Sequence, residues 1–268
     1  MFVLLSLTVL CTDFQSRRNR KKKIMERLDK ILASQGAKSR KDVKEIVKNG
    51  RVAVNGKTVK DPSVKIGEKD KVYLDGKELI LKKHIYLMMN KPEGVVSVSD
   101  SKSEKTVVDL VPEEFFRSGL FPAGRLDKDT VGFVLITDDG DFAHRILSPK
   151  NHIVKTYEAR LAYTLSEEKR DLLQKGIVLS DGTACLESRV KILENGNNPL
   201  AAIQICEGKY HQIKRMFVAA GNKVISLKRT KMGNLALDET LKSGECREIT
   251  PEELLKIESG KFFSDFEQ

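Results

Sequence analysis

The hydrophobic pattern of this chain changes its period at Gly50. Before that residue, apolar side chains recur at positions i, i+3 and i+4 in two segments. This spacing predicts two short helices, the first of which opens at Met25. After Gly50 the pattern changes to a period of two over residues 51–54 (RVAV), and Asn55-Gly56 is a hairpin signal. Residues 25–83 are therefore predicted to form a small domain of two helices followed by a twisted sheet.

The positive charge is concentrated in the same part of the chain. Residues 1–83 hold 22 Lys and Arg against 10 Asp and Glu, whereas residues 84–268 hold 26 against 28. A basic leading module is typical of proteins that meet a polyanion. Nucleic acid is favoured because neutralising its phosphates releases counterions. The alternative is a solvated basic face without a partner.

The composition excludes several classes of protein. Of the 268 residues, 40% are hydrophobic and 32% charged, which argues against a disordered chain or a coiled coil. No apolar run approaches the ~20 residues that a membrane helix needs. The cysteines are dispersed, without a CxxC pair or a histidine at ligand spacing, which predicts a cytoplasmic protein without metal sites or disulfides. The four cysteines are Cys11, Cys185, Cys206 and Cys246.

Residues 1–24 do not fit the pattern of the rest. Met1–Cys11 is apolar, but no positive charge precedes it, and residues 12–23 are polar and basic. A secretory signal needs the reverse order and small residues at a cleavage site. We expect a non-structural or disordered extension, and a cleaved export signal is the alternative.

The second part of the chain mixes strands and helices. Strand patterns occupy residues 86–89, 132–137 and 154–162, and the Asn195–Asn198 turn joins two more strands in a hairpin. Helical patterns occupy four segments: 138–147, 166–176, 213–221 and 251 onward. Hairpins with interspersed helices predict an α+β fold with a mixed, mainly antiparallel sheet. This domain is expected over residues 84–258, with a tail over residues 259–268.

Asp127 is the sharpest candidate for chemistry. It stands in a predicted turn ahead of an apolar strand, with Arg125 two residues before it. A carboxylate at a strand end, kept ionised by a nearby cation, suits nucleophilic or general-base chemistry. The alternative is an ordinary turn-forming aspartate.

Two further segments carry cations interleaved with aromatic side chains. Residues 207–231 contain seven Lys or Arg and one acid, with Tyr210 and His211 among them. Such groups suit phosphates and unstacked bases, although a solvated amphipathic helix is the alternative. Tyr157 lies on a predicted strand. Its ring either stacks on a base or is an ordinary half-buried aromatic residue of the strand.

The leading module resembles the S4 RNA-binding domain. The resemblance rests on residues 26–33 (ERLDKILA), 39–42 (SRKD) and 49–56 (NGRVAVNG) and covers most of residues 25–83. It implies that the second helix and the following turn lie against structured RNA. The expected RNA-binding side chains are Arg40, Lys41, Lys44 and Arg51. A basic helical hairpin that only packs on the next domain is the alternative.

Residues 85–250 resemble the pseudouridine synthases of the RsuA-type branch, in which an S4 domain commonly comes first. Six motifs match in order: 90–96 (NKPEGVV), 106–110 (TVVDL), 124–130 (GRLDKDT), 135–140 (LITDDG), 155–157 (KTY) and 207–216 (EGKYHQIKRM). Six ordered motifs are more specific than any one of them. The resemblance implies that Asp127 is an essential catalytic residue rather than a turn former.

The other site residues follow from the same motifs. Tyr157 matches the tyrosine that stacks on the target base, and Lys214 matches the basic residue that pairs with the aspartate. Ile213 matches an aliphatic residue of the pocket, and Arg125 an arginine near the displaced base. Because Lys214 stands where arginine is common, Arg215 is expected to share its role. Val131 and Phe133 also depart mildly from the usual pattern.

The resemblance implies isomerisation of one uridine in 16S ribosomal RNA by a monomeric enzyme without cofactor or metal. Whether Asp127 attacks C1′ or removes the 2′ proton stays open. The alternatives are a large-subunit (23S) rRNA pseudouridine synthase and an RNA-binding ribosome-assembly factor without turnover. A glycoside hydrolase using Asp127 and Asp129 is disfavoured, because the chain has no Trp and only 6% aromatic residues.

Overall fold

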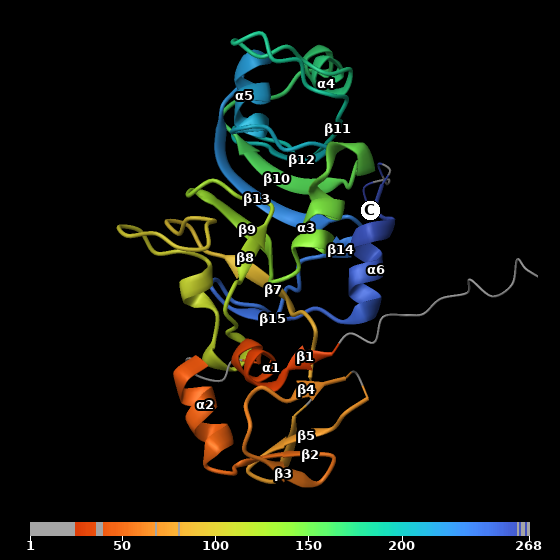
Figure 1. The fold of residues 1–268 in the computed structure, drawn as a ribbon. Coiled ribbons are helices and arrows are strands. Elements are labelled where there is room, and N and C mark those ends of the chain that lie inside the picture. The colour runs from red at the N-terminus through yellow and green to blue at the C-terminus, as the bar shows by residue number, and fades with distance from the viewer. Residues whose placement is uncertain are drawn as a thin grey trace, which may run out of the picture. The chain divides into compact units, whose positions relative to one another are not determined.

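The computed structural model describes residues 25–35, 40–67, 69–79, 81–261, 263 and 266. The extension expected over residues 1–24 lies outside them. The described residues form two compact units (Figure 1): a small one of residues 25–33 and 40–81, and a large one that contains residues from 82 onward. No helix within the described residues is long and apolar enough to cross a membrane.

The small unit contains the two predicted helices, α1 (Leu28–Ser34) and α2 (Arg40–Lys48). The prediction that the first helix opens at Met25 is wrong. Residues 26–27 form a strand, β1 (Glu26–Arg27), paired with β4 (Lys65–Ile66). The backbone N–H groups of Leu28 and Asp29 donate to the carbonyls of Val64 and Pro62, which fixes the chain in an extended approach to the helix.

A four-stranded antiparallel sheet completes the small unit, in the order β3-β2-β5-β6. Its strands are β2 (Val52–Val54), β3 (Lys57–Val59), β5 (Val72–Leu74) and β6 (Lys77–Leu79). The predicted turn at Asn55-Gly56 is confirmed, with both φ angles positive at 50° and 78°. Asp75-Gly76 forms the second hairpin turn in the same way.

The large unit is built on one long mixed sheet in the order β11-β12-β10-β13-β9-β7-β15. Strands β9 and β13 pair in parallel and the other neighbours are antiparallel, so the predicted α+β fold is confirmed. Strand β8 adds to β9, and β14 adds to β13. The bounds are β7 (Tyr86–Lys91), β8 (Phe121–Ala123), β9 (Thr130–Thr137), β10 (Lys155–Leu161), β11 (Arg189–Glu194), β12 (Leu200–Ile205), β13 (Val224–Met232), β14 (Leu235–Ala236) and β15 (Cys246–Glu248).

Helices cover both faces of this sheet. Alternate residues of β9 enter different cores: Val134 and Ile136 pack with α4 and α5, whereas Phe133 and Leu135 pack with α3 and α6. The helices are α3 (Gly140–Leu147), α4 (Glu167–Gln174), α5 (Gln212–Ala219) and α6 (Pro251–Ser259), with short 3-10 helices at Val108–Leu110, Glu113–Phe115 and Pro149–Asn151.

The predicted helix starts are confirmed by their capping contacts. The Ser166 side chain accepts a hydrogen bond from the Lys169 backbone, and Thr250 and Glu253 form a reciprocal capping box. The basic segment 207–231 is not one helix. It is helical only over α5, and its last cations lie on strand β13.

Gly132 lets the parallel pair β9–β13 form beside the Asp127 loop. Its φ is +98°, and a Cβ there would lie 2.4 Å from the carbonyl oxygen of Arg229. A larger residue would push the two strands apart. The loop of residues 124–129, which enters β9, is thereby held against the middle of the sheet.

Candidate active site

A cleft opens in the large unit where the 124–129 loop faces β10 and the start of α5. Its narrow part has a volume of about 80 Å³ and is lined by Asp127, Tyr157, His211 and Lys214, with apolar walls. A wider part of about 770 Å³ shares several of these residues and extends along the sheet. The wider volume is in the range of ligand-binding pockets.

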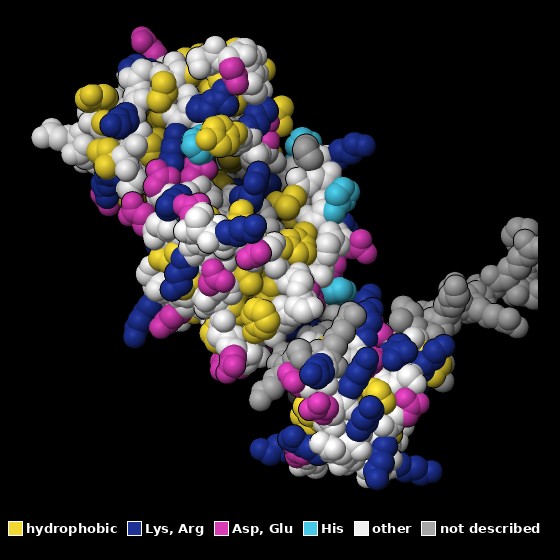
Figure 2. Space-filling model, turned by 60° about the vertical axis from the view of Figure 1, so that its left-hand side comes forward, with side chains coloured by type: hydrophobic (Ala, Val, Ile, Leu, Met, Phe, Trp, Pro, Cys, Tyr) yellow, Lys and Arg dark blue, Asp and Glu magenta, His cyan; other side chains and the backbone are white. Residues whose placement is uncertain are grey.

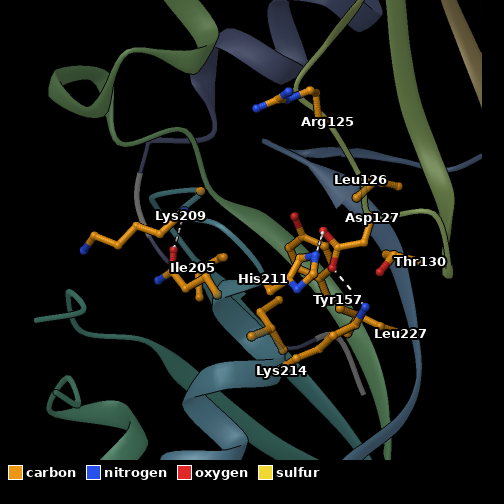
Figure 3. A pocket seen from close by; sticks show the side chains of 13 residues that line it. Arg125, Leu126, Asp127, Thr130, Tyr157, Ile205, Lys209, His211, Lys214 and Leu227 are labelled. Atoms are coloured by element: carbon orange, nitrogen blue, oxygen red, sulfur yellow. Dashed lines mark hydrogen bonds and ion pairs between the residues drawn. The ribbon is translucent and has the colours of Figure 1, made fainter. Parts of the chain in front are cut away.

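Asp127 forms an ion pair with Lys214 inside this cleft. The Lys214 Nζ atom lies 2.9 Å from Asp127 Oδ2 and 2.5 Å from Asp129 Oδ1. The Asp127 and Lys214 side chains are only 25% and 24% exposed, whereas Asp129 is 63% exposed. Figure 3 shows Asp127 directed toward Lys214 and His211, in the cleft that Tyr157 also lines. The expected aspartate–lysine pair is thus present in the structure.

Lys214 stays charged because its two carboxylates outweigh its burial. Burial disfavours the ammonium form, but the hydrogen bonds to Asp129 and Asp127 raise the pKa of Lys214 above its ordinary value. The hydrogen bond from Lys214 in turn lowers the pKa of Asp129. One cation therefore holds two carboxylates at the entrance to β9.

Tyr157 forms the floor of the cleft. It lies on β10 and is 8% exposed. The side chains of Ile205, Ile213 and Leu227 line the pocket beside it, on three different elements. A flat aromatic ring with aliphatic walls is a suitable surface for a planar base, and the Asp127 carboxylate lines the same cleft, where the attached sugar would lie.

His211 lies on the other side of Asp127. Its Nε2 atom is 3.5 Å from Asp127 Oδ1, and its φ is +47°, in the left-handed region, just before α5 begins. The ring of Tyr210 stacks on His211 with centroids 3.8 Å apart, although Tyr210 itself is 76% exposed. The predicted aromatic pair therefore sits at the rim of the cleft, partly in solvent.

The two arginines expected near Asp127 lie elsewhere around it. Arg125 is exposed, lines the cleft and extends away from Asp127 in Figure 3. Arg215 does not share the role of Lys214, because its guanidinium pairs with Asp181 at 2.6 Å. That hydrogen bond is the main reason that the pKa of Asp181 falls to about 2. Consecutive residues of a helix point about 100° apart, so only one of the two reaches Asp127.

The cations expected to bind RNA in the small unit are on its surface. Lys41 and Lys44 on α2 are exposed, and Arg51 is half exposed and pairs with Asp75. Nothing is described of the side chain of Arg40. Figure 2 shows Lys and Arg side chains spread over the visible surface of this unit. They belong to a different unit from the Asp127 cleft.

Lys91 is a site residue that the sequence did not reveal. Its side chain is completely buried, and its Nζ atom donates to the carbonyls of Pro92, Lys128 and Thr130 at 2.8–3.1 Å. Two of these carbonyls belong to the segment around Asp127. Burial lowers the pKa of Lys91 to about 8. Its place in the 90–96 motif was the available signal, but nothing in that motif indicates burial.

Comparisons with known proteins agree with this geometry. A family model described as RNA pseudouridylate synthase matches residues 85–219, and one described as S4 domain matches residues 26–72. A crystal structure of a pseudouridylate synthase superposes with a TM-score of 0.61 and 37% identity, over 86% of this chain and 99% of that one.

Proteins of similar length carry related names. The uncharacterized RNA pseudouridine synthase YtzG of Bacillus subtilis is 46% identical over 85% of this chain and 96% of its own length. Ribosomal small subunit pseudouridine synthase A of Haemophilus influenzae is 39% identical over 86% and 99%, and ribosomal large subunit pseudouridine synthase B of Bacillus subtilis is 36% identical over 87% and 96%. The predicted resemblance is confirmed: the chain belongs to the RNA pseudouridine synthase family and carries an S4 domain ahead of its synthase domain.

Proposed function

We propose that this protein converts one uridine of 16S ribosomal RNA to pseudouridine. The observation that carries the proposal is the Asp127–Lys214 ion pair in an open cleft that Tyr157 also lines. The small-subunit substrate is supported by relatives from several bacteria that are named small subunit synthases, at 38–41% identity.

The reaction needs a carboxylate at a ribose and a platform for a base. A uridine inside a stack cannot be reached, so it is flipped into the cleft onto Tyr157. The C1′–N1 bond breaks, the uracil turns over, and C5 bonds to C1′; C5 loses a proton and N1 gains one. Atoms therefore balance without a donor, oxidant or metal. Ionised Asp127 acts on the ribose, either at C1′ or at the 2′ hydrogen.

The remaining residues hold these two groups and the RNA. Lys214 fixes the position of the Asp127 carboxylate through their ion pair, and Ile213 packs beside the base. Arg125 occupies the space left by the displaced base, while Tyr210 and His211 contact neighbouring nucleotides at the rim, near Arg215. Residues 25–83 grip the surrounding RNA as the S4 domain, and residues 84–258 carry out the reaction. The proposed enzyme acts as a monomer, and a ribosomal RNA substrate fits a cytoplasmic protein.

Mapping of pseudouridine in ribosomal RNA tests this proposal. We expect one small-subunit site to disappear when the gene is removed and to return when it is restored. Loss of a site in large-subunit RNA would instead support the large-subunit alternative, for which the Bacillus subtilis relative at 36% identity is the reason. An unchanged map would support a binding protein without turnover.

A further inference from the structure

Two buried cations in the wide part of the cleft have no carboxylate partner among the described residues. Lys155 on β10 is 7% exposed and Arg229 on β13 is 2% exposed, and both line the cleft that Asp127 enters. Their strands are neighbours, and Arg229 is paired in register with Tyr157. Lys155 and Arg229 were not assigned a role by the motifs.

The contacts of these two cations are neutral. Arg229 donates from Nε to the carbonyl of Phe133 at 2.6 Å and from Nη2 to the carbonyl of Gly124 at 3.3 Å. Within the described residues, Lys155 Nζ has no hydrogen bond or ion pair. The nearby Cys206 supplies no counter-charge, because burial raises the pKa of its thiol above the ordinary value. Buried charges are usually paired, so we expect an anion from outside the chain to bind beside Lys155 and Arg229.

The other lysines around the cleft are neutralised. Lys214 pairs with Asp127 and Asp129, Lys209 pairs with Glu207 at 2.6 Å, and Lys128 pairs with Glu104 at 2.6 Å. Glu207 is the other carboxylate that lines the wide part, and it is already engaged. Besides Lys209, it accepts hydrogen bonds from the Gln212 side chain and the Leu186 backbone. Among the described residues, the uncompensated positive charge of the wide part therefore lies on Lys155, Arg229 and Arg125, of which Lys155 and Arg229 are buried and Arg125 is exposed.

The position of this charge matches the geometry of a nucleotide. Lys155 and Tyr157 are two residues apart on one strand, so their side chains emerge from the same face, roughly 6.6 Å apart along it. The Arg229 guanidinium carbon lies 6.0 Å from the centroid of the Tyr157 ring. In a nucleotide one ribose separates the base from the phosphate. A base on Tyr157 with its ribose at Asp127 brings a flanking phosphate toward the two cations.

We propose that Lys155 and Arg229 form a phosphate subsite that binds the phosphodiester next to the flipped uridine. This subsite rests on the proposed function, since it assumes a nucleotide on Tyr157. Binding the phosphate fixes the ribose against Asp127, so Lys155 is a positioning residue for the reaction. Burial, and secondarily the charge of Arg229, lower the pKa of Lys155 to about 8, which leaves the amine mainly protonated at neutral pH.

Salt dependence of RNA binding tests the subsite directly. The full chain, Lys155→Met, Lys155→Arg and the control Lys175→Met are titrated with a small-subunit rRNA transcript over a series of KCl concentrations. Lys175 is exposed at the end of α4 and does not line the cleft. We expect Lys155→Met to reduce the slope of log affinity against log salt by about 0.7, the value of one phosphate contact to single-stranded RNA. Lys155→Arg and Lys175→Met should keep the wild-type slope. A wild-type slope in Lys155→Met would overturn the proposal.

Pseudouridine formation by the same variants distinguishes a failure of the subsite from a failure of the proposed function. Pseudouridine formation should fall about 10- to 100-fold in kcat/KM with Lys155→Met and less with Lys155→Arg, because a loosely held ribose misaligns. If the wild-type protein forms no pseudouridine in this transcript, the proposed function fails, while the salt slopes still decide whether a phosphate is bound.

Chemical labelling of the wild-type protein avoids any folding defect of a variant. Acylation of Lys155 by sulfosuccinimidyl acetate is followed by mass spectrometry with and without the rRNA transcript. Transcript at about ten times its Kd should slow labelling of Lys155 about tenfold and leave Lys175 unchanged. Equal labelling rates of Lys155 with and without RNA would contradict the subsite.

Discussion

The two units of this protein hold their positive charges in opposite ways. In the small unit, Lys41 and Lys44 stand exposed on α2. In the large unit, Lys214 is held between two carboxylates, and Lys155 and Arg229 are buried in the sheet. Exposed lysines are flexible and can contact phosphates in many positions, without holding any of them in a fixed geometry. Buried cations have fixed positions, and so they can place a single reacting group.

The difference explains why the net charge of the chain is a poor guide to its chemistry. Most of the excess Lys and Arg is in residues 1–83, whereas residues 84–268 are nearly neutral. The reaction is nevertheless assigned to the nearly neutral part, because the Asp127–Lys214 pair and its cleft lie there. We expect variants of the large unit to change the rate and variants of the small unit to change affinity.

The largest effect is expected for Asp127→Asn. Losing the ionised carboxylate should reduce single-turnover pseudouridine formation by about 10⁴-fold or more, with RNA affinity nearly intact. The matched control is Asp129→Asn, which removes the other partner of Lys214 and should cost less than about tenfold, because Asp129 is largely exposed. Equal losses in both variants would contradict the assignment of Asp127.

Lys214→Met should come next, with a loss of about 10²- to 10³-fold in kcat. The Asp127 carboxylate then loses its fixed partner in a partly buried cleft. Lys214→Arg should recover part of the rate, whereas Arg215→Met should leave the Asp127 pair intact, because Arg215 pairs with Asp181. Single-turnover rates of the three variants decide this. A larger loss for Arg215→Met than for Lys214→Met would reverse the roles.

The buried amine of Lys155 should be visible in the pH dependence of stability. Its pKa of about 8 in the folded protein lies below the ordinary value of 10.5. Between these pH values the unfolded chain binds more protons, so the unfolding free energy of the wild type should rise with pH. Relative to Lys155→Met, the gain should reach up to about 3 kcal/mol. Denaturant titrations of both proteins at pH 7 and pH 10 measure this gain. If the difference in unfolding free energy between the two proteins is the same at both pH values, Lys155 is not buried as described.

Removal of residues 25–83 should act on affinity rather than on the chemical step. We expect rRNA binding to weaken about 10- to 100-fold and the salt dependence to flatten, since several phosphate contacts are lost. The rate at saturating RNA should change far less. Binding titrations at several salt concentrations, together with single-turnover rates, test this. An unchanged salt slope would show that the S4 domain makes no phosphate contacts with the RNA.

The smallest effect is expected for Lys44→Gln in the small unit. Loss of this one exposed lysine should reduce the slope of log affinity against log salt by about 0.7–0.9, with no change in kcat. Glu45→Gln, on the next residue of the same helix, is the control and should not weaken binding. A reduced kcat in Lys44→Gln would break the separation between the two units.

The sequence predicted local features well, because they depend on neighbouring residues. The Asn55-Gly56 turn and the helices expected from residues 166 and 251 follow from short-range rules, and the structure shows each of them. The start of the first helix was predicted wrongly at Met25, because pairing with the distant strand β4 holds residues 26–27 extended.

The parts of the site that escaped prediction depend on contacts between distant residues. The parallel pairing of β9 with β13 joins segments about a hundred residues apart, and the antiparallel pairing of β10 with β13 brings Arg229 beside Tyr157. The hydrophobic periodicity of a sequence does not indicate which distant strands pair with each other. The same applies to Lys91 and Lys155, which are charged residues that a sequence pattern places at the surface and the fold buries.

The central claim is that Asp127 acts on a uridine of small-subunit RNA. Replacing the chromosomal gene by its Asp127→Asn form and sequencing ribosomal RNA for pseudouridine tests it in the cell. We expect one small-subunit site to lose its pseudouridine although the variant protein is present and still binds RNA. Retention of every modified site in that strain would contradict it.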